Sequence, residues 1–160
     1  MNHLHVDCEL KFASDGTPEG TFSGYASVFG LLDQVGDIVE RGAFKATLGE
    51  WRKRKGMPSL LWQHRSDEPI GVWTAMEEDD KGLKVEGELI MEVGKAKEAY
   101  ALMKRGAIKG LSIGYRTKDY ELDRTTGVRK LKKVDLMEVS LVTSPALREA
   151  QISAVKGDVD

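Results

Sequence analysis

Three residue types that together support nucleophilic catalysis occur at distant points of this 160-residue chain: Ser112, His64 and Glu138. A serine hydroxyl is a poor nucleophile until a base takes its proton, and the base must itself be oriented by a partner. A serine, a histidine and a carboxylate on separate core strands are the arrangement that acyl transfer requires. Whether the three meet depends on the elements that carry them.

Ser112 follows a change from a helical to an extended pattern. Apolar residues recur at three- and four-residue intervals over residues 94–105, which predicts a helix that ends at Gly106. Beyond it the period is two, so Ser112 shares its face with Gly110 and Gly114. A hydroxyl flanked by residues without side chains is open to a large substrate such as a peptide. The alternative is a bulge or bend at the glycines, with Ser112 as a small packing residue.

His64 ends an apolar strand predicted over residues 59–64, directly before a polar loop. A histidine there would be held rigidly and still reach a substrate, although a half-buried histidine that caps the sheet is an equal alternative. Glu138 lies inside an apolar strand predicted over residues 136–142, where a carboxylate needs a partner. An imidazole N–H would serve and would fix the histidine tautomer. A lysine or arginine across the sheet is the alternative.

Other reactive residues give weaker predictions. Residues 3–12 alternate as an amphipathic strand would, so His3 and His5 point the same way and, with His64, could bind a metal. A solvated strand face explains them better, and we expect no metal site and no cofactor. Cys8, the single cysteine, falls on the apolar face and is expected to be a buried filler. No internal disulfide can form, which favours a reducing compartment.

Composition limits the classes of function. With 41% hydrophobic and 31% charged residues, the chain is expected to be one soluble globular domain over residues 1–160. A formal net charge of −2 gives no reason to expect nucleic acid or an anionic membrane as partner. No apolar run approaches the roughly 20 residues of a membrane span, and no basic region followed by an apolar core suggests a secretion signal.

The elements that must position the candidate residues are mostly short strands. The patterns predict eight or nine strands, a short extended segment at 38–40, and helices at 42–51 and 94–105. The strands are expected at 3–12, 21–29, 59–64, 70–77, 82–90, 108–115, 117–122, 129–134 and 136–142, the first two as a hairpin. This balance predicts a β-rich α+β fold: a mostly antiparallel bent barrel of about seven strands with helices packed outside it.

Five motifs resemble, in order, those of the prohead maturation serine proteases of tailed bacteriophages. They are GYASVF (24–29), GDIVERGAF (36–44), LWQH with PIG (61–64 and 69–71), GLSIGY (110–115) and EVSLVTSPA (138–146). Each is weak alone, but five in the right order are specific, and the similarity covers about residues 22–156. The family is similar in fold to the herpesvirus assemblins, which are bent barrels of about seven strands wrapped by helices.

The resemblance implies a role for each candidate residue. Ser112 would be the nucleophile, His64 the general base and then acid, and Glu138 the orienting carboxylate, where the herpesvirus relatives have a histidine. Ser140, on the same strand face as Glu138, is expected to be a small packing neighbour. Backbone amides of residues 143–147 are the candidates for an oxyanion hole, except that of the proline, which has no N–H.

The same resemblance implies a serine endopeptidase of capsid maturation, acting inside the assembling procapsid in the host cytoplasm. Its expected substrates are the scaffold or delta segment of the major capsid protein, and such enzymes commonly also cut themselves. No nucleic acid, membrane or cofactor is expected. A homodimer is left open, because the assemblin relatives pair through a helix. The rival from a different class is a non-catalytic capsid-assembly or scaffold-binding module with the same fold.

Overall fold

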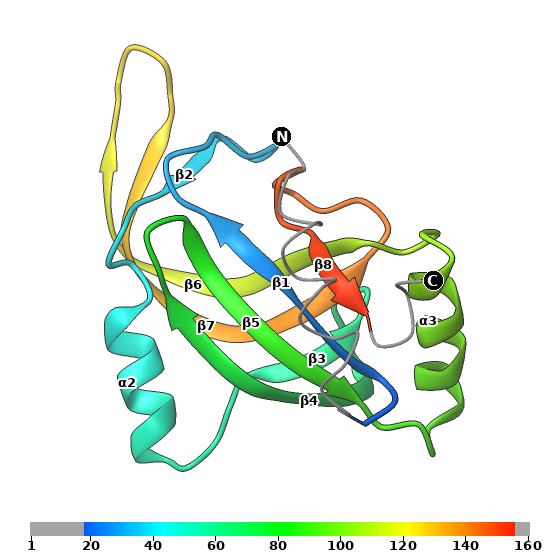
Figure 1. The fold of residues 1–160 in the computed structure, drawn as a ribbon. Helices are drawn as coiled ribbons and strands as arrows, with labels where there is room; N and C mark the ends of the chain where they lie inside the picture. The colour runs from blue at the N-terminus through cyan, green and yellow to red at the C-terminus, as the bar shows by residue number, and fades with distance from the viewer. Residues whose placement is uncertain (1–17, 156–160) are drawn as a thin grey trace.

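Eight strands curl into a half-barrel, with two helices outside it, in the computed structural model of the chain, which describes residues 18–155 (Figure 1). The strands are β1 (Thr21–Val28), β2 (Asp37–Val39), β3 (Ser59–Trp62), β4 (Arg65–Glu78), β5 (Gly82–Leu89), β6 (Gly110–Leu122), β7 (Arg129–Val142) and β8 (Ile152–Val155). The helices are α2 (Lys45–Lys53) and α3 (Gly94–Lys104). The β-rich prediction is confirmed. The strand predicted over residues 3–12, with His3, His5 and Cys8, lies outside the described residues.

The sheet is mixed, with two parallel pairs among mostly antiparallel ones, and it has eight strands where a barrel of about seven was predicted. Its order is β2-β7-β3-β4-β5-β1-β8, with β6 paired to the other edge of β7. Five neighbouring pairs are antiparallel, whereas β2 and β3 both run parallel to β7. The backbone of residues 150–152 forms hydrogen bonds with Tyr25 on β1 and with Lys109 and Leu111 at the start of β6. The segment that leads into β8 therefore links β1 to β6.

β6 and β7 are each one long strand where the sequence predicts two. β6 spans the predicted strands 108–115 and 117–122, and β7 spans 129–134 and 136–142. Three register shifts, the first of them between Gly114 and Tyr115, let the pairing continue. A bulge absorbs an unpaired residue without ending the ladder. The outer halves of the two strands form an arm that projects from the half-barrel (Figure 1).

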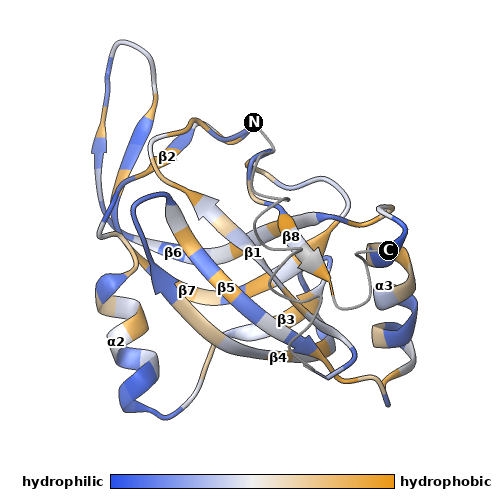
Figure 2. Ribbon diagram, viewed as in Figure 1, coloured by the Kyte–Doolittle hydropathy of each residue, from blue (hydrophilic) through white to orange (hydrophobic). Residues whose placement is uncertain are grey.

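The start of α2 is capped by a residue from the sheet. The helix begins at Lys45, later than the predicted start at residue 42. The N–H groups of Gly42 and Phe44 donate to the two carboxylate oxygens of Glu78 on β4, at 2.9 and 2.8 Å. Because these N–H groups have no partner within the helix, a carboxylate from another element satisfies them. α3 matches its prediction closely, and in Figure 2 both helices alternate hydrophilic and hydrophobic residues.

Apolar side chains from both helices and most strands form one core, which also contains the neighbours of the candidate residues. Leu111 and Leu141, adjacent in sequence to Ser112 and Ser140, are fully buried. Since protein interiors are close-packed, strands with such neighbours hold their remaining side chains in fixed positions. Among the described residues, no helix is long and apolar enough to cross a bilayer.

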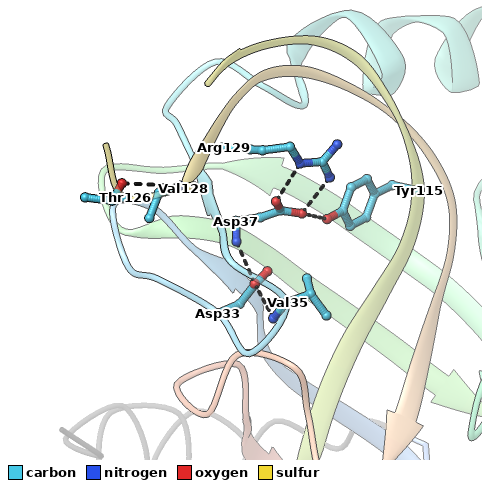
Figure 3. Close-up of polar contacts among 7 residues, drawn as sticks. All are labelled: Asp33, Val35, Asp37, Tyr115, Thr126, Val128 and Arg129. Carbon is cyan, nitrogen blue, oxygen red and sulfur yellow. Dashed lines mark hydrogen bonds and ion pairs between the residues drawn. The ribbon is translucent and has the colours of Figure 1, made fainter. Parts of the chain in front are cut away.

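A buried aspartate on β2 is bonded to a partly exposed arginine on β7 and to a tyrosine on β6 (Figure 3). Asp37, only 2% exposed, accepts hydrogen bonds from Arg129 Nε at 2.8 Å, from Arg129 Nη2 at 2.9 Å and from the Tyr115 hydroxyl at 2.9 Å. The arginine is the main cause that lowers the pKa of Asp37, while burial and the Asp37 contact raise the pKa of Tyr115. Just before β2, Asp33 Oδ1 accepts hydrogen bonds from the N–H groups of Val35 and Asp37.

Arg129→Ala is expected to destabilise the protein by about 3 kcal/mol, because it leaves the buried Asp37 carboxylate without its cation. The pKa of Asp37 is depressed in the folded protein, so the ion pair stabilises it above the unfolded carboxyl pKa. That stabilisation is lost as the pH falls through the lower folded pKa. Urea unfolding should therefore give a lower free energy of unfolding for the variant than for wild type at neutral pH, and this difference should decrease in acid.

The control for this variant is Arg124→Ala, which changes an exposed arginine in the loop between β6 and β7. A surface substitution of this kind is expected to change stability by less than about 0.5 kcal/mol. Equal unfolding free energies for the two variants would show that the Asp37–Arg129 ion pair contributes no net stability.

Candidate active site

β7 lies between β3 and β6 and brings the three candidate residues together. In the β6–β7 pairing, Ser112 is opposite Ser140, and Gly114 is opposite Glu138. Opposed residues of a sheet point to the same face, so Ser112, Ser140 and Glu138 share one face. β3 pairs with the same segment of β7 from the other side, and the turn after β3 carries His64.

His64 belongs to the tight turn that joins β3 to β4. Trp62 pairs with Arg65, so Gln63 and His64 form a two-residue hairpin loop in which both have positive φ, 51° and 61°. Such loops ordinarily contain asparagine or glycine, because a side chain disfavours the left-handed region. The loop predicted over residues 65–68 is instead the start of β4. A strained turn at this place persists only if its surroundings hold it.

Contacts with the end of β7 hold this turn. The Gln63 N–H donates to the Leu141 carbonyl at 2.9 Å, and the Gln63 side-chain amide donates to the Thr143 hydroxyl at 2.7 Å. The His64 N–H donates to Ser140 Oγ at 3.0 Å. The histidine backbone is thereby fixed to the strand that carries Glu138.

The His64 ring and the Glu138 carboxylate are in direct contact. Nδ1 of His64 lies 2.5 Å from Oε2 of Glu138. This contact is the main cause that raises the pKa of His64, although partial burial acts in the opposite direction. When Nδ1–H donates to the carboxylate, Nε2 is the basic nitrogen. The histidine side chain is 41% exposed and the glutamate side chain 16%, so the ring is accessible while its partner is largely covered.

Gly114 makes room for the carboxylate. A Cβ at this position would lie 2.3 Å from Glu138 Oε2, and a Cβ at Gly110 would lie 2.7 Å from the ring of Pro145. Contacts this short do not occur in folded proteins, so a side chain at Gly114 would displace the Glu138 carboxylate, and one at Gly110 would collide with Pro145 and the Val142 backbone. Their positions in the sequence predicted open access to the serine hydroxyl. In the structure they face other residues.

Ser112 and His64 line one pocket of about 240 Å³ beside this contact. Ser112 is 8% exposed. The walls are mainly apolar and come from β1, β2, β6, the β1–β2 loop and residues 146–147, which belong to the segment predicted to supply an oxyanion hole. Within residues 18–155, no hydrogen bond joins the Ser112 hydroxyl to the His64 ring. Catalytic contacts in unliganded proteins are often long and tighten when substrate binds, so a catalytic pair does not require this hydrogen bond in the unliganded chain.

Ser140 forms hydrogen bonds in the structure, although it was predicted only to pack. Ser140, predicted to be a packing neighbour, donates to Glu138 Oε1 at 2.7 Å and accepts the His64 N–H. A serine two residues from a candidate carboxylate was the only sequence signal for this contact, and it did not distinguish bonding from packing.

In the described part of the chain no group of three potential ligands is placed to hold a metal ion. The alternative that uses His3 and His5 involves residues outside that part.

Comparison with known proteins identifies the family. The sequence model of the caudovirus prohead serine proteases matches residues 8–160, nearly the whole chain. The chain belongs to this family. The family resemblance stated from the five motifs is therefore confirmed.

Two relatives of this chain are named prohead proteases. The prohead protease of Enterobacteria phage HK97 is 37% identical over 153 residues, covering 94% of this chain and 66% of the relative. The prohead protease of Escherichia phage T5 is 28% identical over 155 residues, covering 96% of this chain and 72% of the relative. The chain thus spans about two thirds of the length of the HK97 protein.

Two further matches are a phage polyprotein and a solved structure. The capsid polyprotein of Pseudomonas phage PAJU2 is 38% identical over 164 residues, covering 97% of this chain and 22% of the polyprotein. The structure of the bacteriophage T4 capsid assembly protease superposes with a TM-score of 0.60 at 11% identity, covering 76% of this chain and 80% of that chain. At that identity the likeness supports the fold alone.

For a member of this family, Gly114→Ala is expected to lower kcat for peptide cleavage about 100-fold, because the added methyl group must displace the Glu138 carboxylate from the His64 ring. The control is Gly94→Ala at the start of α3, where a Cβ would meet nothing within 4 Å. Steady-state kinetics with both purified variants, alongside thermal unfolding, test this. A Gly114→Ala protein that cleaves at the wild-type rate would show that Glu138 need not occupy this position.

Proposed function

We propose that this chain is a serine endopeptidase of phage capsid maturation, with Ser112 as nucleophile, His64 as general base and then acid, and Glu138 as the orienting carboxylate. The observation that carries the proposal is the 2.5 Å contact between His64 Nδ1 and Glu138 Oε2, beside a pocket that Ser112 and His64 both line. Membership of the prohead serine protease family supports the reaction class. The residue roles rest on the geometry.

The proposed reaction proceeds in two halves. His64 Nε2 takes the proton of the Ser112 hydroxyl as its oxygen attacks the substrate carbonyl carbon, and the resulting imidazolium is stabilised by the Glu138 carboxylate. The imidazolium then protonates the amine of the breaking C–N bond, which leaves an ester on Ser112. Water, deprotonated by the same nitrogen, attacks the ester and releases the carboxylic acid product and the free hydroxyl. The amides of Ala146 and Leu147, which line the pocket, are candidates to bind the oxyanion.

The proposed substrates are the scaffold or delta segment of the major capsid protein, cut inside the procapsid in the host cytoplasm. The names of the relatives, two prohead proteases and a capsid polyprotein, support this substrate class. Self-cleavage, a homodimer and likeness to the herpesvirus assemblins extend the same proposal. Mass measurement on the purified chain tests self-cleavage, its oligomeric state tests the homodimer, and superposition on an assemblin structure tests the likeness in fold.

The proposed function is tested by co-expressing the chain with the major capsid protein of its phage and measuring the fragment masses. Wild type should yield a shortened capsid protein, while Ser112→Ala should leave it intact and remain folded. Identical fragments from Ser112→Ala would exclude Ser112 as the nucleophile. An intact capsid protein that co-purifies with wild type would favour the non-catalytic assembly module. Loss of wild-type cleavage on addition of a chelator would favour the metal hydrolase alternative.

A further inference from the structure

Ser140 is bonded at one oxygen atom to both members of the His64–Glu138 pair. Its Oγ accepts the His64 backbone N–H at 3.0 Å, and its hydroxyl donates to Glu138 Oε1 at 2.7 Å. The directions are fixed, since a backbone amide can only donate and an ionised carboxylate can only accept. Ser140 is 0% exposed, so no water competes for these bonds.

These contacts close a ring of interactions around the histidine. The His64 backbone contacts Ser140, Ser140 contacts one oxygen of Glu138, and the other oxygen contacts His64 Nδ1. Holding Oε1 sets the rotation of the carboxylate and therefore aims Oε2 at the ring. Holding the N–H stabilises a backbone that lies at φ 61°, a conformation that is costly for histidine.

We propose that Ser140 is a positioning residue of the protease proposed above, on which this inference rests. Its hydroxyl fixes the His64 backbone and the Glu138 carboxylate together, so that Nε2 is presented on the face where Ser112 lies. Ser140 is also directly opposite Ser112 in the β6–β7 pairing. One residue of β7 therefore pairs with the strand of the nucleophile and accepts a hydrogen bond from the turn that carries the histidine. Partners that orient a catalytic group contribute to its effect without touching the substrate.

Ser140→Ala tests this role, because it removes both hydrogen bonds and adds no bulk. The expected result is a kcat lower by about 10- to 100-fold, the usual cost of losing an orienting partner, with KM within about twofold. The acid limb of the kcat/KM profile should move to lower pH, because a Glu138 carboxylate that is no longer held raises the pKa of His64 less. Ser140→Cys, which keeps a weak donor of similar size, should fall between wild type and Ser140→Ala.

Ser23→Ala is the matched control. Ser23 is a serine of β1 with 4% exposure, and its hydroxyl has no hydrogen-bond partner among the described residues. Removing it should change neither kcat nor the pH profile. If Ser140 only fills space, Ser140→Ala should resemble this control: reduced or unchanged stability, with kcat within threefold and an unmoved acid limb. That result would overturn the inference and leave the proposed function in place.

An NMR titration of the His64 ring separates failure of the inference from failure of the proposed function, because it needs no activity. The histidine pKa is compared in the Ser112→Ala and Ser112→Ala/Ser140→Ala proteins, with Ser112→Ala/Ser140→Cys as the second pair if the alanine variant does not fold. A lower histidine pKa in the Ser140 variant supports positioning, and equal values overturn it. Normal cleavage by Ser112→Ala would instead overturn the proposed nucleophile.

Discussion

Ser112→Ala, His64→Ala and the double variant are expected to lose peptide cleavage by the same factor, on the order of 10⁵ in kcat. The reason is that the hydroxyl is nucleophilic only while the imidazole takes its proton, so removing either group removes the same step. Both residues line the same pocket, and the histidine ring is accessible from it. Single-turnover cleavage of a peptide from the capsid precursor, with folding checked by circular dichroism, measures all three variants.

Non-additivity is the informative part of this experiment. If the double variant were 100-fold slower than either single variant, the serine and histidine would contribute to separate steps, and the proposed pair would be wrong. Ser23→Ala should retain the wild-type rate, because its hydroxyl is buried on β1, outside the residues that line the pocket.

The local pattern around Ser112 and Glu138 was sufficient to predict the strands that carry them. Alternation over residues 108–115 and 136–142 reflects burial of one or both sheet faces, which is a local property of sequence. A carboxylate among apolar residues also correctly predicted that Glu138 needs a partner, because the cost of burying a charge does not depend on the fold. Which of the two predicted partner types it contacts, an imidazole or a cation, was decided by the structure.

Pairing between distant strands could not be predicted from the same patterns. The parallel alignment of β3 with β7 depends on segments about 80 residues apart, and it is this alignment that brings His64 beside Glu138. The Gln63–His64 turn carries neither glycine nor asparagine, so turn propensity gave no signal for it. Its conformation is held by hydrogen bonds with Ser140, Leu141 and Thr143, which only the folded sheet supplies. The same limit explains why Ser140 was interpreted as a packing residue.

Glu138→Gln is expected to lower kcat by about 10³-fold and to shift the acid limb of kcat/KM to lower pH. Loss of the negative charge removes the stabilisation of the imidazolium that forms when Ser112 gives up its proton. In wild type, contact with Glu138 raises the pKa of His64 above its ordinary 6.5, so the histidine stays protonated, and inactive as a base, to a higher pH. Without the carboxylate the ring should lose its proton at a pH closer to that ordinary value.

The lower kcat reduces the rate, whereas the shift of the acid limb to lower pH favours activity in acid. A general disruption of the fold would not produce both effects. The variant should be slower at every pH, yet below the wild-type limb it should retain a larger fraction of its own maximal rate. Glu121→Gln, at an exposed position in the outer half of β6, should leave both rate and limb unchanged. A Glu138→Gln protein whose limb coincides with wild type would mean that the carboxylate does not face the histidine in the working enzyme. The third member would then have to be sought among the polar groups that line the pocket, where Asp33 carries the one carboxylate among the described lining residues.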